Sequence, residues 1–227
     1  MIEYLPWDSD FFNFKVGKTT ITNSDFDFVA FENSLNNFKL VYLFSDSPIE
    51  NSNNLFEEQK LTFSKPVEPS VSQSTKGIFN LRLISTNSKK LEDLVYLSGE
   101  NSRFNLDPNF SNNEFKSMYL YWFKQAFDYS LGKQVVLKVL DGEPVGFVLY
   151  SIKGHFLNIE LISVLPTFQG KGIASELLKE LESVAFNNAC LFLQVVTQGV
   201  NLKAVALYEK YGFHLKEKKF VYHFWNI

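Results

Sequence analysis

The stretch LPTFQGKGIASELLKEL, Leu165 to Leu181, places two glycines where a strand-like run gives way to a helical one. Beyond Gly172 the apolar residues form one helical stripe: Ile173, Leu177, Leu178, Leu181 and Val184. The first turn of a helix presents unpaired N–H groups and a partial positive charge, and glycines let an anion reach those amides. The stretch therefore predicts a phosphate-binding helix start, with a bare strand-to-helix corner as the alternative.

Two better-known phosphate loops do not fit the spacing. A P-loop needs a glycine five residues before its Gly-Lys pair, and Phe12 occupies that position before Gly17-Lys18-Thr19. A dinucleotide fingerprint needs a third glycine where Ser175 stands, and more strands downstream than remain here. The glycine turn therefore fits neither of these two phosphate loops.

The bulk composition is that of a globular protein: 227 residues, 45% hydrophobic and 21% charged. The net charge of −3 predicts no general affinity for nucleic acid or anionic membranes. No apolar run approaches the ~20 residues that span a bilayer, and the acidic beginning MIEYLPWDSDFF is unlike a secretory signal. We therefore expect a cytoplasmic protein without a membrane partner.

Cysteine and histidine usage indicates no metal site. Cys190 is the single cysteine and is interpreted as a small buried hydrophobe, with covalent catalysis by its thiol as the rival role. His155, His214 and His223 show no metal-ligand spacing, and we interpret all three as strand residues. We expect no metal in the reaction.

The Pro- and Ser-rich segment SKPVEPSVSQSTKG, residues 64–77, is the best candidate linker. It predicts a small N-terminal α/β region, residues 1–75, and a larger domain, residues 76–227. The larger domain follows the order β-α-α-β-β-β-α-β-α-β, and a Ser111…Glu114 capping box begins its second helix. We predict an α/β (α+β) fold with a mixed, mostly antiparallel central sheet flanked by helices.

Two segments together resemble the GCN5-related N-acetyltransferase (GNAT) superfamily. Gln169 to Ala174 is similar to the Q-x-x-G-x-A loop that holds the pyrophosphate of acetyl-coenzyme A in that family. Downstream, NLKAVALYEKYGF, Asn201 to Phe213, resembles the family's N-x-x-A-x-x-L-Y-x-x-x-G-F segment. The resemblance covers about Gly77 to Ile227 and implies the GNAT fold.

The resemblance further implies an N-acetyltransferase that uses acetyl-coenzyme A as co-substrate, with direct attack by the amine in a ternary complex. Backbone groups around Ile162 to Val164 would meet the pantetheine arm and the thioester, and the amides of the glycine turn would take the pyrophosphate. The cofactor-binding residues expected from it are Ile162, Val164, Gln169, Gly170, Lys171, Gly172, Ile173, Ala174, Asn201 and Tyr208.

Two residues are candidates for proton transfer. Tyr208 stands where many family members carry the acid that protonates the leaving thiolate, and a core aromatic is its alternative role. Glu160, expected on the same strand face as Ile162 and Val164, is the candidate base for the amine, directly or through water. A charge on a half-exposed strand is the alternative for Glu160, and an amine of low pKa needs no protein base.

The acceptor is suggested by a second resemblance. LPWDSDFFNFKVGK, Leu5 to Lys18, resembles the opening W-[DE]-S-x-F-F of the TDP-fucosamine (dTDP-4-amino-4,6-dideoxygalactose) acetyltransferases, although Asn13 stands where a glycine often follows the paired Phe. SRFNLDP, Ser102 to Pro108, followed by MYLYWFKQAF, resembles their segment between the first two helices. This implies acetyl transfer to the amine of a nucleotide-linked amino-deoxysugar.

Such an acceptor needs a cation for its diphosphate and an aromatic wall for sugar and base. The candidate substrate-binding residues are Arg103, Phe104, Tyr119 and Trp122, with core packing and a surface charge as their alternative roles. Other amines, namely an aminoglycoside, a polyamine or a protein N-terminus, stay open as acceptors. So do a non-catalytic acyl-coenzyme A-binding module and a homodimer.

Overall fold

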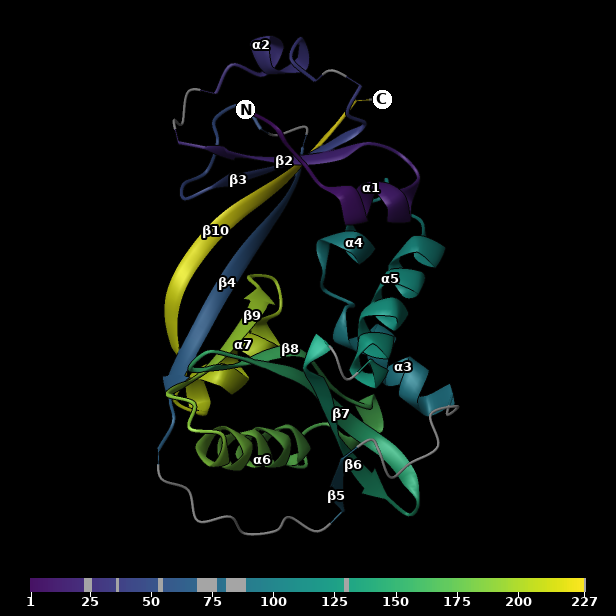
Figure 1. The fold of residues 1–227 in the computed structure, drawn as a ribbon, viewed down its shortest axis with the longest axis vertical. Coiled ribbons are helices and arrows are strands. Elements are labelled where there is room, and N and C mark those ends of the chain that lie inside the picture. Colours follow the sequence, from purple (N-terminus) through teal and green to yellow (C-terminus); the bar gives the residue numbers. More distant parts are fainter. Residues whose placement is uncertain are drawn as a thin grey trace. The chain divides into compact units, whose positions relative to one another are not determined.

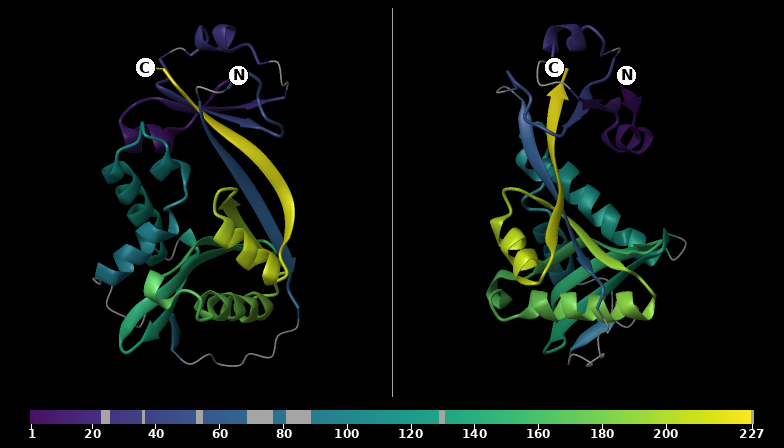
Figure 2. Two further views of the ribbon diagram at one scale, coloured as in Figure 1. Left: turned by 180° about the vertical axis from the view of Figure 1, so that it is seen from behind. Right: turned by 90° about the vertical axis from the view of Figure 1, so that its left-hand side faces the viewer.

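A computed structural model describes residues 1–22, 26–35, 37–52, 55–68, 77–80, 89–128 and 131–226. The chain divides into two compact units. The first comprises Met1–Leu61, Gln198–Val200 and Glu217–Ile227, and the second comprises Thr62–Thr197 and Asn201–Lys216. Two long strands, β4 (Phe56–Pro66) and β10 (His214–Trp225), run side by side and contribute residues to both units (Figure 2). The predicted boundary between residues 75 and 76 lies outside the described residues.

The first unit is built on β1 (Glu3–Tyr4), α1 (Pro6–Phe12), β2 (Val16–Ile21), α2 (Phe28–Glu32) and β3 (Leu40–Ser45), with its parts of β4 and β10. Its strand order is β1-β2-β3-β10-β4, in which β2 and β3 are parallel and β3 and β10 antiparallel. Five of the 24 phenylalanines, Phe26, Phe28, Phe31, Phe38 and Phe224, surround a buried cluster here. These aromatic side chains therefore contribute to the core of this unit.

The second unit contains β5 (Ile78–Asn80), α3 (Lys89–Ser98), α4 (Arg103–Leu106), α5 (Asn112–Lys124), η2 (Gln125–Phe127), β6 (Lys133–Leu140), β7 (Glu143–Lys153), β8 (Phe156–Val164), η4 (Pro166–Phe168), α6 (Ile173–Asn187), β9 (Phe192–Gln198) and α7 (Leu202–Lys210) (Figure 1). Its strand order is β4-β9-β8-β7-β6-β5. The pairs β5–β6, β6–β7 and β7–β8 are antiparallel, and β8–β9 is parallel. The predicted mixed, mostly antiparallel sheet flanked by helices is confirmed.

Helices cover both faces of this sheet, as the paired residues of β7 and β8 show. Phe147 and Ser163 are paired and face one way: the Phe147 ring lies 5.5 Å from the Phe123 ring of α5, and Ser163 Oγ donates to the Leu94 carbonyl of α3 at 2.7 Å. The preceding residue of β7, Gly146, faces the other way, because a Cβ built on it would lie 3.1 Å from Ile173 of α6. Thus α3 and α5 lie on one face and α6 on the other (Figure 1).

Local sequence signals are confirmed at several turns and caps, with one exception. Ser111 Oγ accepts from Glu114 N at 3.2 Å, and Glu114 Oε2 accepts from Ser111 N at 2.6 Å, so the predicted capping box begins α5. Cys190 is buried as expected. The interpretation of His155 as a strand residue is wrong: it lies in the turn between β7 and β8, where Gly154 has φ +58°.

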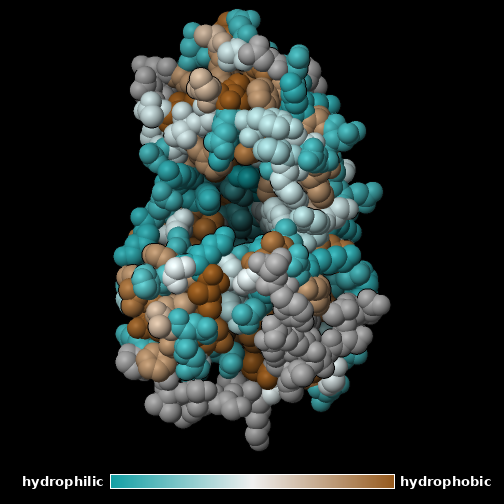
Figure 3. Space-filling model, in the orientation of Figure 1, coloured by the Kyte–Doolittle hydropathy of each residue, from teal (hydrophilic) through white to brown (hydrophobic). Residues whose placement is uncertain are grey.

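The visible face of the protein carries apolar residues in small groups among hydrophilic ones (Figure 3). In the part of the chain that the structure describes, we find no helix with the length and apolar character that crossing a membrane requires.

Candidate functional site

The glycine turn follows β8 after the short helix η4. The side-chain amide Nε2 of Gln169 donates to the Val164 carbonyl at 3.0 Å and so ties the turn to the end of the strand. Gly170 and Gly172 have φ of +74° and +84°, a region that residues with a Cβ rarely adopt. A Cβ built on either glycine meets nothing within 4 Å. Backbone conformation therefore requires glycine here, and the space above both residues is open.

The turn delivers the chain into α6, whose N-cap is Gly172. Because glycine has no side chain, the N-cap offers no side-chain acceptor to the N–H groups of the first turn, Ile173 to Ser175. These N–H groups and the positive end of a 15-residue helix together favour an anion. This geometry favours a phosphate-binding helix start over a bare strand-to-helix corner, and phosphate binding itself stays a prediction.

The strands that frame this turn separate as they approach it. The pairing of β8 with β9 runs from Phe156–Phe192 to Ile159–Val195, whereas β8 itself continues to Val164. The last residues of β8 thus lie beyond its pairing with β9, where a parallel neighbour would otherwise occupy their hydrogen-bonding edge. Ile162, Ser163 and Val164 line a cavity at this point.

The cavity has a volume of about 520 Å³ and lies within the second unit. Its walls come from β8, the glycine turn, the start of α6, the inner face of α7 and the end of α3. It is lined by all but one of the expected cofactor-binding residues, namely Ile162, Val164, Gln169, Gly170, Gly172, Ile173, Ala174, Asn201 and Tyr208. The exception is Lys171, which is exposed and holds its Nζ 5.0 Å from the Phe168 ring.

Tyr208 is both a cavity residue and a core aromatic. It is 2% exposed, and its ring packs against Phe213 at 5.6 Å and Phe63 at 6.1 Å. Burial raises the pKa of its phenol above the ordinary value, so the hydroxyl stays protonated and can donate. On the same helix, Asn201 Oδ1 accepts from Ala204 N at 3.2 Å and caps α7.

Glu160 lies on β8 but outside the set of residues that line the cavity. Its carboxylate forms an ion pair with Lys133 Nζ at 2.7 Å and accepts from Ser151 Oγ at 2.7 Å. The β7–β8 register passes from Leu149↔Leu161 to Tyr150↔Ile159, so Glu160 is the extra residue of a β-bulge. The expected role of Glu160 as base stays a prediction, and the carboxylate is held by two neighbouring strands.

The four expected acceptor residues form an aromatic cluster around α4 and α5, outside the cavity lining. Phe104 and Tyr119 are buried, and their rings lie 5.8 Å and 5.0 Å from that of Trp122. The Arg103 guanidinium lies 4.7 Å from the Phe104 ring. These contacts describe packing, and a role in acceptor binding stays a prediction.

Sequence reasoning missed several residues of the cavity. Lys203 and Lys210 line it from α7, and their i, i+7 spacing was a usable signal of a shared helix face. Leu97, Ser98, Glu100 and Asn101 line it from the end of α3, which no local pattern connects to the glycine turn. The cavity thus carries charged groups that are not among the fixed positions of the two motifs.

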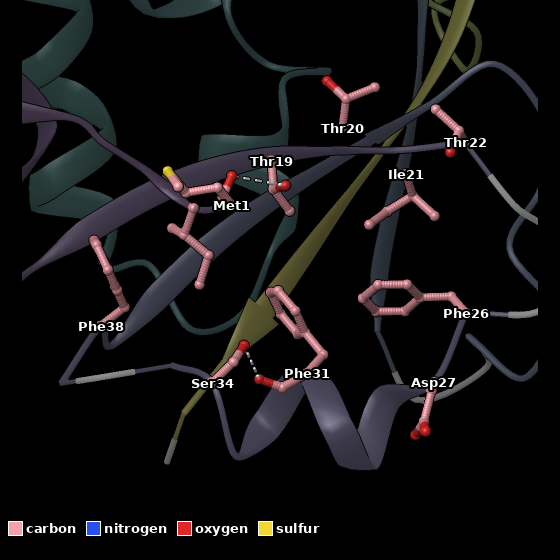
Figure 4. A pocket seen from close by; sticks show the side chains of 11 residues that line it. Met1, Thr19, Thr20, Ile21, Thr22, Phe26, Asp27, Phe31, Ser34 and Phe38 are labelled. Atoms are coloured by element: carbon pink, nitrogen blue, oxygen red, sulfur yellow. Dashed lines mark hydrogen bonds between the residues drawn. The ribbon is translucent and has the colours of Figure 1, made fainter.

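A second cavity, of about 580 Å³, lies in the first unit between β2 and α2 (Figure 4). Its polar side chains serve local structure: Thr19 Oγ1 donates to the Met1 carbonyl, Ser34 Oγ donates to the Phe31 carbonyl, and Asp27 caps α2. Its described lining contains neither lysine nor arginine, so it is poorly suited to a phosphate. Among the described residues, no group of three or more His, Cys, Asp or Glu side chains could hold a metal.

Comparison with known proteins gives one family, the Acetyltransferase (GNAT) family, which matches residues 103–213. A curated relative is the spore coat polysaccharide biosynthesis protein SpsD of Bacillus subtilis (strain 168), which is 27% identical over 124 residues, 55% of this chain and 43% of that protein. The chain spans less than half the length of the curated relatives it matches.

Solved structures share the fold. A functionally unknown conserved protein from Staphylococcus epidermidis ATCC 12228 superposes with a TM-score of 0.63 at 15% identity, over 94% of this chain and 85% of that one. A GCN5-related N-acetyltransferase from Sphaerobacter thermophilus gives 0.53 at 16% identity, over 82% and 59%. At such identities the likeness is one of fold alone.

Proposed function

We propose that this chain, which the Acetyltransferase (GNAT) family matches over residues 103–213, transfers the acetyl group of acetyl-coenzyme A to an amine. The observation that carries the proposal is a single cavity, in which the open glycine turn, the separated end of β8 and Tyr208 meet. An anion site, a slot beside a strand and a proton donor are the three parts that acyl transfer from a thioester needs.

The cofactor's diphosphate would lie on the amides of Gly170 to Ala174, where no Cβ blocks the approach to the two glycines. Lys203 and Lys210 add positive charge on the α7 side of the cavity, suited to phosphate oxygens. The pantetheine arm would follow the end of β8 at Ile162 to Val164. Backbone N–H groups there would stabilise the negative charge that develops on a thioester oxygen under attack.

Tyr208 would protonate the departing thiolate. A thiolate is a better leaving group when a donor is at hand, because its conjugate acid has a pKa of ~8.5. Burial keeps the Tyr208 phenol protonated at neutral pH. Its rigid packing against Phe213 would hold the hydroxyl in one place.

The amine must lose a proton to attack. We propose that Glu160 receives it through water, since Lys133 and Ser151 hold its carboxylate on β8. The direct route is disfavoured, because Glu160 is not among the residues that line the cavity. An acceptor with a low amine pKa would dispense with this step.

For the acceptor we propose the amine of a nucleotide-linked amino-deoxysugar. Two features support it: the Trp7 to Phe12 segment with its dTDP-sugar resemblance, and the relative SpsD, a polysaccharide biosynthesis protein. Arg103, Phe104, Tyr119 and Trp122, together with residues 1–75, are the proposed contributors to its binding. The alternatives are an aminoglycoside, a polyamine or a protein N-terminus as acceptor, or a non-catalytic acyl-coenzyme A-binding module.

The test is release of free thiol from acetyl-coenzyme A by the full chain, across dTDP- and UDP-amino sugars, spermidine and kanamycin. Turnover with a nucleotide-amino sugar above all other amines is the expected result. Turnover with the small amines alone would overturn the sugar assignment. Tight coenzyme A binding without thiol release on any amine would favour the non-catalytic module.

A further inference from the structure

The cavity carries opposite charges on its two sides. Glu100 contributes the one carboxylate among the described lining residues, and Lys203 and Lys210 contribute the ammonium groups. The lysines stand on α7, whereas Glu100 follows the C-terminus of α3. A site that must hold an anionic cofactor beside a cationic amine needs positive charge on one side and negative charge on the other.

Resting on the proposed function, we infer that Glu100 binds the ammonium group of the acceptor and selects amines over their uncharged counterparts. Two features of the α3 end favour a cation. Leu97 and Ser98, the last residues of α3, line the cavity and bring the partial negative charge of the helix C-terminus to it. The Glu100 carboxylate itself adds a full negative charge.

The carboxylate is available for a ligand. Within the described part of the chain Glu100 makes neither an ion pair nor a side-chain hydrogen bond, and its side chain is exposed. Glu160 differs, because its carboxylate is engaged by Lys133 and Ser151 and lies outside the cavity lining. Of the two glutamates, Glu100 is therefore the one placed to meet an acceptor.

The backbone around Glu100 is fixed, so that its position is set before a ligand arrives. Gly99 N donates to the Tyr96 carbonyl at 3.1 Å, and Ser102 N donates to the Gly99 carbonyl at 2.9 Å. The Glu100 carbonyl accepts from Asn105 Nδ2 at 2.8 Å.

Tyr119 packs directly beneath this turn. A Cβ on Gly99 would lie 2.3 Å from the Tyr119 ring, so only glycine fits over it. Tyr119, expected from the sequence as a substrate-binding residue, would then act on the acceptor indirectly, as a positioning residue for Glu100.

The experiment compares Glu100→Gln with wild type and with Glu209→Gln, an exposed control on α7 with the same change of charge. The probes are dTDP-4-amino-4,6-dideoxygalactose and spermidine as acceptors, and dTDP-6-deoxygalactose, the 4-hydroxy counterpart of the sugar, as competitive inhibitor. In Glu100→Gln we expect KM for the amine to rise about tenfold, as for loss of a charge-assisted hydrogen bond. KM for acetyl-coenzyme A should not change.

The ratio of the inhibition constant of the hydroxy sugar to the KM of the amino sugar should fall toward one in Glu100→Gln. The same ratio should keep its wild-type value in Glu209→Gln. A Glu100→Gln variant with wild-type KM and undiminished amine preference would overturn the inference while leaving acetyl transfer intact. A loss of coenzyme A affinity in that variant would also overturn it, because it would indicate a structural role. If wild type releases no thiol with any amine, the proposed function itself fails, and this is seen before any variant is compared.

Discussion

Gln169 and Val164 are joined by a hydrogen bond of 3.0 Å from the side-chain amide Nε2 to the backbone carbonyl. This bond crosses from the glycine turn back to the last residue of β8, and both residues line the cavity. The side chain of Gln169 would thus support the proposed anion site, while the backbone that follows it would provide the donors.

Replacing Gln169 by Ala should therefore loosen the turn. A net hydrogen bond is worth about 1 kcal/mol, so we expect the Kd for coenzyme A to rise about fivefold with little change in kcat. Calorimetry on Gln169→Ala measures it. Thr167→Ala, an exposed neighbour in η4 outside the cavity lining, is the control, and equal affinities in the two variants would contradict this role for Gln169.

Gly172→Ala should damage both folding and binding. At φ +84° a Cβ costs about 1 kcal/mol of stability, and at the α6 N-cap it also intrudes on the open approach to the amides. Gly154→Ala is a matched control, since Gly154 has φ +58°, equally open surroundings and a place in the β7–β8 turn. Both variants should lower Tm, but only Gly172→Ala should weaken coenzyme A binding; equal weakening in both would count against the anion site.

Tyr208→Phe should lower kcat by about a hundredfold, in the range of general acid catalysis, with an unchanged Kd for coenzyme A. Burial raises the pKa of the phenol, so the acid stays protonated past the ordinary value of about 10. The wild-type rate should accordingly show no descending limb between pH 7 and 9.5. A limb in that range that vanishes in Tyr208→Phe would show an acid with a lowered pKa and contradict the burial argument.

The burial of Tyr208 also predicts how the stability of the protein depends on pH. The phenol ionises more readily in the unfolded chain than in the folded one, so its contribution is fully present below pH ~10 and is lost as pH rises above that value. Denaturant unfolding from pH 8 to 11 should show a shallower loss of stability in Tyr208→Phe than in wild type. Identical slopes would mean that Tyr208 is exposed to water in solution.

Glu182 ties three elements of the second unit together. Its carboxylate pairs with Lys65 of β4 and accepts from Tyr211 Oη, just past α7, at 3.1 Å. Glu182→Gln should lower the free energy of unfolding by about 1–2 kcal/mol, because a half-buried ammonium loses its counter-charge. Glu180→Gln on the same helix is the control for charge alone, and equal stabilities of the two variants would refute the role of the cluster.

The glycine turn, the helix that follows it and the caps could be predicted from sequence alone because their determinants are local. A glycine at positive φ, as at Gly172, and an N-cap asparagine, as at Asn201, act within a few residues of chain. The same is true of the Ser111…Glu114 capping box. Such features can be predicted without knowing which residues pack against them.

The roles of Glu160, Tyr119 and Glu100 depend on partners distant in sequence. Lys133 and Ser151 reach Glu160 from β6 and β7, across a bulge that periodicity does not reveal. Helical spacing places Tyr119 on an apolar face, but it does not tell whether the ring belongs to the core or to a binding site. In the structure the ring lies against Gly99. The first unit likewise draws on three separate segments of the chain, which no linear reading of composition can join.

The central claim is that main-chain amides at the start of α6 hold the diphosphate of coenzyme A. Titration of the ¹⁵N-labelled full chain with coenzyme A, followed by amide chemical shifts, tests it most directly. The account predicts saturable shifts that are largest at Gly170, Gly172, Ile173 and Ala174. Saturable binding that leaves these amides unmoved, or no binding at all, would contradict it.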